Sequence, residues 1–312
     1  MNEFRLKDRR VWVAGHRGMA GSAIARRLAR EECELITVTR SELDLLRQAD
    51  VEEWMATQKI DAIFLAAATV GGILANSTRP AKFLYENLTI ETNVIHGAKT
   101  TGVKKLLFLG SSCIFPRMAE QPMREEALLT GALEPTNEAY AIAKIAGIKL
   151  AQAYCHQYGC NFVSVMPTNL YGPGDRYDTE NGHVVAALIM KIHAAKTANL
   201  PTVELWGSGT PKREFLFSDD LADACVFVMK HYSGEMFLNV GTGYDISILE
   251  LAQTIAKVVG WDGTFTFNAS KPDGMPRKVM DISRLEDLGW TASTDFEAGM
   301  KQAYEWYVTH IA

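Results

Sequence analysis

Two side chains four positions apart, Tyr140 and Lys144, are suited to proton transfer. They lie in the stretch NEAYAIAKIAG, whose pattern is helical, and positions four apart share one face of a helix. An ammonium beside a phenol favours the phenolate and lowers the phenol pKa. Such a tyrosine can exchange a proton with a carbonyl oxygen near neutral pH. We therefore expect Tyr140 to be a catalytic acid and Lys144 to adjust its pKa.

A second reactive group follows the apolar run KKLLFLG, which predicts a buried strand. The next residues are Ser111, Ser112 and Cys113, in the stretch GSSCIFP. A hydroxyl at this place can hydrogen-bond a substrate carbonyl, and a thiol can accept or return a proton. The alternatives are a strand-end cap for Ser112 and a packed core thiol for Cys113.

The elements that must position these groups alternate along the first half of the chain. Strand and helix in regular succession indicate right-handed βαβ units, and so an α/β fold with a Rossmann-type doubly wound parallel sheet. Ligands of such sheets bind at the carboxyl ends of the strands. The apolar runs predict strands at 11–15, 34–39, 62–68, 105–112 and 161–167, and the helical patterns cover 19–31, 47–58, 79–100 and 138–158.

The end of the first strand carries a glycine-rich turn. Gly15, Gly18 and Gly21 lack the Cβ atoms that would block a tight turn and close approach of backbone amides to a pyrophosphate, and the helix that follows favours an anion at its N-terminus. We expect the whole turn to contact a dinucleotide: Gly15, His16, Arg17, Gly18, Met19, Ala20 and Gly21.

The choice of dinucleotide rests on the second strand, LITVTR, which ends in Arg40 rather than in an acidic residue. An arginine at this place accommodates the phosphate of NADP, and Arg17 supplies a second cation. We predict NADP(H), with Asp44 on the adenine side. The alternative is that both arginines are solvated surface residues.

After Tyr171 the regular pattern loosens into the loop GPGDRYDTENGHV, a helix near 183–196 and short strands. We expect residues 1–170 to form the NADP-binding Rossmann domain. Residues 171–312 are expected to form mainly a smaller α+β substrate domain. Segments near 215–245 have the pattern of elements that return to the first domain.

Composition excludes several classes of function. The 312 residues carry a net charge of −5 with 47% apolar and 22% charged residues, which gives no basic face for nucleic acid. The longest apolar run, at 62–75, is too short to cross a membrane, and the N-terminal stretch lacks a signal-peptide core, so we expect a cytoplasmic protein without a membrane partner. No metal-ligand spacing is present, and free thiols are expected for Cys33, Cys113, Cys155, Cys160 and Cys225.

The order of a GxxGxxG turn, a serine after the fourth strand and a YxxxK pair resembles the extended short-chain dehydrogenase/reductases over nearly the whole chain. More narrowly, the chain is similar to the members of that family that epimerise GDP-4-keto-6-deoxy-D-mannose at carbons 3 and 5 and reduce it at carbon 4 to GDP-L-fucose. The motifs that carry this likeness are GHRGMAGSAI, LAAATVGGILAN, LGSSCIFP, EPTNEAYAIAKIAGIKL, MPTNLYGP, WGSGTPKREFL and ASKPDGMPRK.

The resemblance implies roles for particular residues. Cys113 and His183 serve the epimerisation, Ser111 hydrogen-bonds the keto oxygen beside Tyr140, and NADPH delivers the hydride. His183 lies in GHVVAAL, which departs from the more usual SHVIPAL, so a loop or capping histidine is its alternative. Further implied cofactor contacts are Leu109, Gly110, Ser111, Ser112, Tyr140, Lys144, Pro167, Thr168, Asn169, Leu170 and His183.

The implied contacts to the GDP-sugar are Ser111, Lys191, Trp206, Arg213 and Asp273. A diphosphate needs cations, a base or sugar needs an aromatic wall, and hydroxyl or N–H groups need acceptors. Lys191 as a solvated helix lysine and Trp206 as a core residue are the alternatives.

Related enzymes pair the long helices at 79–100 and 138–158 against a twin, so a homodimer is expected; a monomer with two amphipathic helices facing water is the alternative. Three other functions share this fold: a plain GDP-hexose 4-reductase, another nucleotide-sugar epimerase, or a dehydratase. Cys113 and Ile114 stand where a dehydratase would carry acidic residues, and Arg40 argues against the tightly held NAD of a 4-epimerase. A nucleotide-sensing regulator would be expected to have lost Tyr140, Lys144 or the serine.

Overall fold

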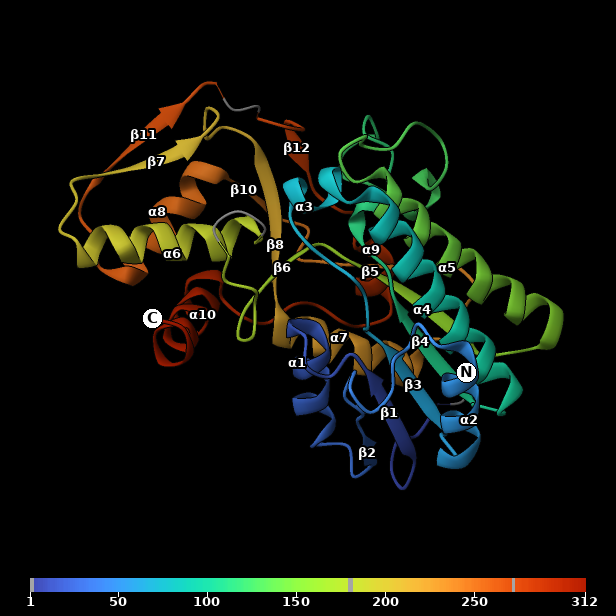
Figure 1. The fold of residues 1–312 in the computed structure, drawn as a ribbon. Coiled ribbons are helices and arrows are strands. Elements are labelled where there is room, and N and C mark those ends of the chain that lie inside the picture. Colours follow the sequence, from blue (N-terminus) through green and yellow to red (C-terminus); the bar gives the residue numbers. More distant parts are fainter. Residues whose placement is uncertain (1–2, 179–181, 271–272) are drawn as a thin grey trace.

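Six parallel strands form the central sheet of the molecule (Figure 1). The computed structural model describes residues 3–178, 182–270 and 273–312. The strand order β2-β1-β3-β4-β5-β9 confirms the expected doubly wound α/β fold. The strands span Arg10–Ala14 (β1), Glu34–Ile36 (β2), Ala62–Leu65 (β3), Lys105–Leu109 (β4), Phe162–Pro167 (β5) and Leu238–Val240 (β9).

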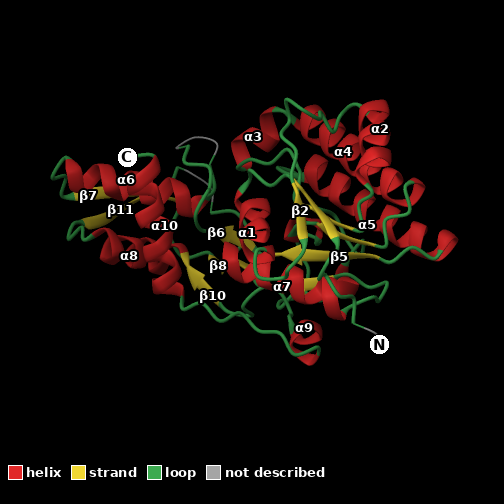
Figure 2. Cartoon of the chain, turned by 90° about the horizontal axis from the view of Figure 1, so that it is seen from below, coloured by secondary structure: helices red, strands yellow, loops and turns green. Residues whose placement is uncertain are grey.

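Helices cover both faces of this sheet, as the two views together show (Figures 1 and 2). On one face α1 (Met19–Leu28) packs against α7 (Ser218–His231). On the other face α4 (Pro80–Thr100) lies between α2 (Gln48–Gln58) and α5 (Glu138–Tyr158). Apart from the edge strand β2, the strands are buried on both sides, which explains why their sequences are nearly continuous apolar runs rather than alternating ones.

Several predicted elements end earlier than their sequence patterns. The strands expected at 34–39, 62–68 and 105–112 stop at Ile36, Leu65 and Leu109, and the remaining residues form loops at the edge of the sheet. The single helix expected at 79–100 begins instead at Pro80, and a short separate helix, α3 (Ile73–Thr78), precedes it. Proline favours the first turn of a helix because it lacks the N–H that an internal position would use.

The second half of the chain builds two small sheets and a third apolar core. The helix expected at 183–196 is present as α6, and residues 179–181 of the preceding loop lie outside the described residues. The strands are β6 (Asn169–Tyr171), β7 (Thr202–Trp206), β8 (Lys212–Phe217), β10 (Asp245–Ser247), β11 (Thr264–Asn268) and β12 (Arg277–Lys278). The helices are α6 (Val184–Thr197), α8 (Ile248–Val259), α9 (Ser283–Asp287) and α10 (Phe296–His310).

A buried carboxylate joins the segments between these two halves. Glu214 on β8 is fully buried and accepts backbone N–H bonds from Thr242 at 2.6 Å, Gly243 at 2.8 Å and Met280 at 2.9 Å. The loop after β9, the strand β8 and the residues after β12 are therefore tied together. In this arrangement Lys278 on β12 pairs in register with Arg213 on β8.

The chain reverses its direction of progress through the sheet between β1 and β3. It steps from β1 outward to β2 and then returns to β3 on the other side of β1. Loops diverge at such a switch point and leave a crevice at the carboxyl ends of the strands. In the described part of the chain, no helix combines the length and apolar character needed to cross a membrane.

Candidate active site

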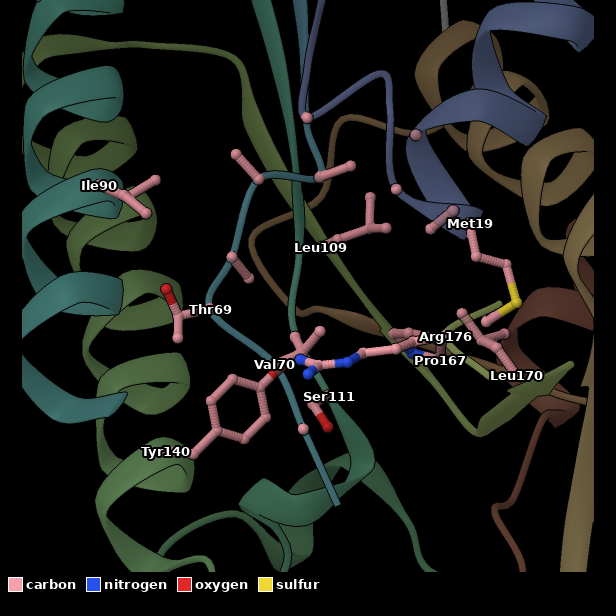
Figure 3. Close-up of a pocket in the computed structure, with 18 of the residues that line it drawn as sticks. Met19, Thr69, Val70, Ile90, Leu109, Ser111, Tyr140, Pro167, Leu170 and Arg176 are labelled. Carbon is pink, nitrogen blue, oxygen red and sulfur yellow. The ribbon is translucent and has the colours of Figure 1, made fainter. Parts of the chain in front are cut away.

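A cleft of about 670 Å³ lies at the carboxyl edge of the central sheet. Figure 3 shows its walls: Leu109, Pro167 and Leu170 come from strands β4, β5 and β6, Met19 comes from the start of α1, and Ile90 comes from α4. The cleft collects every residue expected to contact the cofactor: Gly15, His16, Arg17, Gly18, Met19, Ala20, Gly21, Arg40, Asp44, Leu109, Gly110, Ser111, Ser112, Tyr140, Lys144, Pro167, Thr168, Asn169, Leu170 and His183. Cys113 lines it as well.

The glycine-rich turn at one end of the cleft fits a pyrophosphate. Gly15 has a φ of +90°, and a Cβ on Gly21 would lie 2.1 Å from the Gly15 carbonyl oxygen, so larger residues would push the turn apart. Helix α1 begins after Gly18 without a side-chain cap. Its first N–H groups therefore remain available to an anion in the cleft, as a dinucleotide site requires.

Two arginines stand near this turn, where a 2′-phosphate would lie next to the adenosine ribose. Arg17 and Arg40 both line the cleft and both are exposed. Arg40 forms only a loose ion pair with Asp44, at 3.8 Å, and its side chain is 72% exposed. A pairing so open to water leaves the guanidinium able to bind a phosphate.

Tyr140 points from α5 into the cleft toward Ser111 (Figure 3). Loss of surrounding water raises the phenol pKa well above its ordinary value, and the negative charges of Cys113 and Glu91 raise it further; a hydrogen bond with Ser111 opposes them. The expectation that Lys144 lowers this pKa is wrong for the protein by itself. The main physical reason is that the phenol is buried, and Lys144 also has a negatively charged partner.

The partner of Lys144 is Glu91 on the neighbouring helix α4. The Nζ atom lies 2.9 Å from the Glu91 carboxylate and donates to the Leu109 carbonyl at 3.0 Å. Both side chains are almost fully buried, at 2% and 1% exposed. The negative charge of Glu91 offsets the positive charge of Lys144, so the phenol does not experience an isolated cation.

Cys113 lies one short turn beyond β4, in the 3-10 helix η1 (Ser112–Ile114). Its backbone N–H donates to the Ser111 hydroxyl at 3.4 Å, which fixes the turn. Burial raises the pKa of the thiol, while the positive charge of Lys278 and a hydrogen bond from Ser111 oppose the rise. Lys278 also lines the cleft. The thiol is thus buried but has a cation in its surroundings.

His183 precedes α6 on the opposite wall and lies 3.3 Å from Asp175, measured from Nδ1 to Oδ1. The hydrogen bond to Asp175 raises the pKa of His183 above its ordinary value. Asp175 is itself buried and also accepts the backbone N–H of Arg176 at 2.7 Å. Figure 3 shows the Arg176 side chain reaching across the cleft toward Val70.

The other expected substrate residues form a second group outside the lining of this cleft. The Lys191 ammonium lies 4.9 Å from the centre of the Trp206 ring, and Trp206 is 55% exposed, so it is not a core residue. Asp273 accepts bonds from Ser208, and burial lowers the pKa of the nearby Arg213. Because Arg213 pairs with Lys278, this group adjoins the cleft.

The sequence predicted no role in the site for four residues of the cleft region: Glu91, Asp175, Arg176 and Lys278. Asp175 and Arg176 lie in a loop whose path no local pattern predicts. Glu91 left one signal, since it shares the buried face of α4 with Asn87, Val94 and Ala98. Among the described residues, no cluster of three or more His, Cys, Asp and Glu side chains could hold a metal ion.

Comparison with known proteins agrees with this geometry. Residues 11–241 match the model of the NAD dependent epimerase/dehydratase family, and the chain belongs to that family. It is 56% identical over 312 residues to a protein of Sinorhizobium fredii named GDP-L-fucose synthase, covering 100% of this chain and 99% of the relative. An Escherichia coli protein of the same name is 54% identical, with 97% and 98% covered.

Solved structures extend the likeness to the whole fold. A GDP-L-fucose synthetase from Naegleria fowleri bound to NADP has a TM-score of 0.90 at 28% identity, covering 99% of this chain and 97% of that one. A GDP-6-OMe-4-keto-L-xylo-heptose reductase from C. jejuni has a TM-score of 0.91 at 35% identity, with 99% of both chains covered.

The Asp175–His183 contact predicts a measurable change in titration. Replacing Asp175 by Asn removes the carboxylate that raises the His183 pKa, so the imidazolium should lose its proton at a lower pH. NMR titration of the ring protons measures this, with His183→Gln to assign the signals. Replacing the exposed Asp50 by Asn is the matched control and should leave the His183 curve in place. An unshifted curve in the Asp175 variant would contradict the assigned contact.

Proposed function

We propose that this protein is a GDP-L-fucose synthase. It epimerises GDP-4-keto-6-deoxy-D-mannose at carbons 3 and 5 and then reduces carbon 4 with NADPH. One observation carries the proposal: the cleft holds Ser111, Tyr140 and Lys144, which suffice for reduction, together with a thiol and an imidazole that reduction does not need. The relatives named GDP-L-fucose synthase, 52–56% identical over nearly the whole chain, support it.

The epimerisation rests on Cys113 and His183. The 4-keto group acidifies the protons on carbons 3 and 5, so a modest base can remove one and leave an enolate on the sugar. Cys113 as thiolate takes the proton, and His183 as imidazolium returns one to the opposite face. The raised pKa of His183 suits the acid. Burial raises the pKa of the thiol, and the positive charge of Lys278 opposes this rise and so supports the thiolate. Exchange with water then restores both groups.

The reduction uses Tyr140 as the acid. When bound, NADPH supplies the hydride for carbon 4. Ser111 hydrogen-bonds the keto oxygen, and Tyr140 gives its phenolic proton to that oxygen as the alkoxide forms. Because burial raises its pKa above the ordinary value, Tyr140 carries its proton at neutral pH, and the alkoxide is the stronger base that takes this proton.

The cofactor and the sugar nucleotide bind mainly to different domains of the molecule. Residues 1–170, with the returning segments near 215–245, form the NADP-binding domain, whose glycine-rich turn holds the pyrophosphate. Arg17 and Arg40 hold the 2′-phosphate, and Asp44 lies on the adenine side. Residues 171–312 mainly bind the GDP-sugar, through Lys191, Trp206, Arg213 and Asp273 together with Ser111.

The protein works as a homodimer in the cytoplasm. Helices α4 and α5 carry exposed apolar side chains at Tyr85, Ile142 and Tyr158, which are 66%, 43% and 51% exposed. Burying them against the same helices of a second copy would remove this surface from water. The cytoplasm keeps thiols reduced, as catalysis by Cys113 requires.

The direct test of the function mixes the protein with GDP-4-keto-6-deoxy-D-mannose and NADPH and identifies the sugar product by NMR. GDP-L-fucose is the expected product. A rhamnose or talose nucleotide would make the protein a plain 4-reductase. Binding of NADPH without turnover of the keto sugar would favour a nucleotide-sensing regulator.

Two variants separate the half-reactions. Tyr140→Phe removes the acid of the reduction, so NADPH oxidation should fall by roughly 100-fold or more while the sugar still exchanges protons with heavy water. Cys113→Ser removes the base, so deuterium uptake at carbons 3 and 5 should fall by a similar factor. Reduction at the parent rate in Tyr140→Phe would remove the assigned acid. Unchanged uptake in Cys113→Ser would leave that thiol a packing residue.

Cofactor choice is tested at Arg40. Replacing it by Asp puts a negative charge where the 2′-phosphate binds, so the ratio of kcat/KM for NADPH to that for NADH should fall by roughly tenfold or more. Arg47→Asp, an exposed site outside the cleft lining, is the control and should keep the parent ratio. If Arg40→Asp keeps it too, Arg40 is a surface residue.

The dimer is tested at Ile142 on α5. A glutamate there would place charge inside the proposed helix pair, where an unpaired carboxylate is costly to bury. Sedimentation should report a dimer for the parent and a monomer for Ile142→Glu. Replacing the exposed Val308 on α10 by Glu is the control and should stay dimeric. A monomeric parent would contradict the proposal.

A further inference from the structure

Glu91 is a buried ionisable residue for which the reaction described so far has no use. It lies in the middle of α4 with 1% of its side chain exposed. Apart from the ion pair with Lys144, neither carboxylate oxygen has a hydrogen-bond partner among the described residues. A carboxylate so placed is costly to bury unless it is paired. Its presence therefore requires an explanation through Lys144.

The surroundings fix this pair in one arrangement. The Lys144 ammonium contacts the Glu91 carboxylate, the Leu109 carbonyl and the face of the Phe108 ring, whose centre is 4.7 Å away. Gly147, one turn further along α5, makes room for the acid, because a Cβ there would lie 2.7 Å from the Glu91 Oε2 atom. Helices α4 and α5 pack along their length (Figure 1), so the pair bridges the two helices and the end of β4.

The pair also sets the charge near Tyr140, which precedes Lys144 by one turn. The Lys144 ammonium lies 5.9 Å from the centre of the Tyr140 ring. Burial, Cys113 and then Glu91 raise the Tyr140 pKa, in that order of size. The titratable and charged groups that line the same cleft near the sugar site are Glu86 on α4, Cys113 after β4, Lys144 on α5, Asp175 and Arg176 in the loop after β6, His183 before α6 and Lys278 on β12.

We propose that Glu91 is a positioning residue that holds Lys144 at the end of β4 and offsets its charge, so that Tyr140 stays a neutral phenol ready to protonate the sugar carbonyl. The inference rests on the proposed function and deepens it. An enzyme that begins by oxidising an alcohol needs a phenolate base, and an isolated lysine would provide one. The buried carboxylate directs this cleft toward the reductive role instead.

The test replaces Glu91 by Gln, which keeps the shape and removes the charge. Tyr140 is titrated in the free protein by the near-ultraviolet absorbance of tyrosinate, taken as the difference between each protein and its Tyr140→Phe counterpart. The Tyr140 pKa should fall by roughly one unit or more. Glu305→Gln, an exposed change on α10, is the matched control and should leave the titration as in the parent.

Kinetics gives a second readout that a merely structural role would not move. Reduction needs the protonated phenol, so kcat is lost as the pH rises through the Tyr140 pKa. In Glu91→Gln this loss should begin at a lower pH, by the same shift, with KM for the sugar little changed. A uniform drop in kcat with an unmoved pH profile and an unmoved Tyr140 titration would overturn the inference.

Glu91→Gln leaves a buried ammonium without its partner, which can prevent folding. In that case the double variant Glu91→Gln/Lys144→Met is compared with the parent, because this variant buries neither charge. Because the two charges offset each other in the parent, Tyr140 should titrate in the double variant at nearly the parent pH, and a clear rise of its pKa would show that Lys144 dominates and would overturn the inference. These titrations need no sugar, so they decide the role of Glu91 even if the parent makes no GDP-L-fucose, a result that would contradict only the proposed function.

Discussion

Parallel pairing of the six central strands is the constraint on which the rest of the molecule depends. Because all six run in one direction, the segments that follow β1, β4 and β5 emerge at the same edge of the sheet, although they are far apart in the sequence. The glycine-rich turn, the Ser111 turn and the residues after Pro167 therefore line one cleft. Helix α5 supplies Tyr140 from the face of the sheet, so a cofactor site and a proton donor meet without any local sequence link.

Charged neighbours then change the pKa values of the reactive side chains in the cleft. Each reactive side chain has a charged neighbour from another element: Glu91 acts on Tyr140, Lys278 on Cys113, and Asp175 on His183. Burial is the main cause of the raised Tyr140 pKa and Glu91 adds to it, while Asp175 raises the pKa of His183. Lys278 opposes the rise that burial causes in the Cys113 pKa.

The sequence was sufficient for those parts of the structure that local pattern encodes. The strand and helix succession, the glycine-rich turn and the Tyr140–Lys144 spacing are all short-range signals, and the sheet follows from them with known chirality. The charged partners of the reactive side chains are distant from them in the sequence. Glu91 lies 53 positions before Lys144, and no local pattern distinguishes it from a surface glutamate of a helix. The Tyr140 pKa is raised rather than lowered as expected, because burial of the phenol and then the charges of Cys113 and Glu91 act on it, and all of these depend on the tertiary structure.

The strands in the second half of the chain were also difficult to predict from local sequence pattern. Its strands are short and are paired out of order, as in β8 with β6, β10 and β12, so no periodic pattern predicted them all. Trp206 was predicted as a substrate residue from a motif, and its 55% exposure excludes the core alternative but says nothing by itself about a ligand. Its role stays a prediction.

The central claim is that one cleft performs both epimerisation and reduction. A single-turnover reaction in heavy water, with the protein in excess over GDP-4-keto-6-deoxy-D-mannose and NADPH, tests it most directly. The account predicts GDP-L-fucose carrying deuterium at carbons 3 and 5, with one NADPH oxidised for each sugar reduced. Reduced sugar without deuterium at those carbons would contradict the account and leave Cys113 and His183 without a catalytic role.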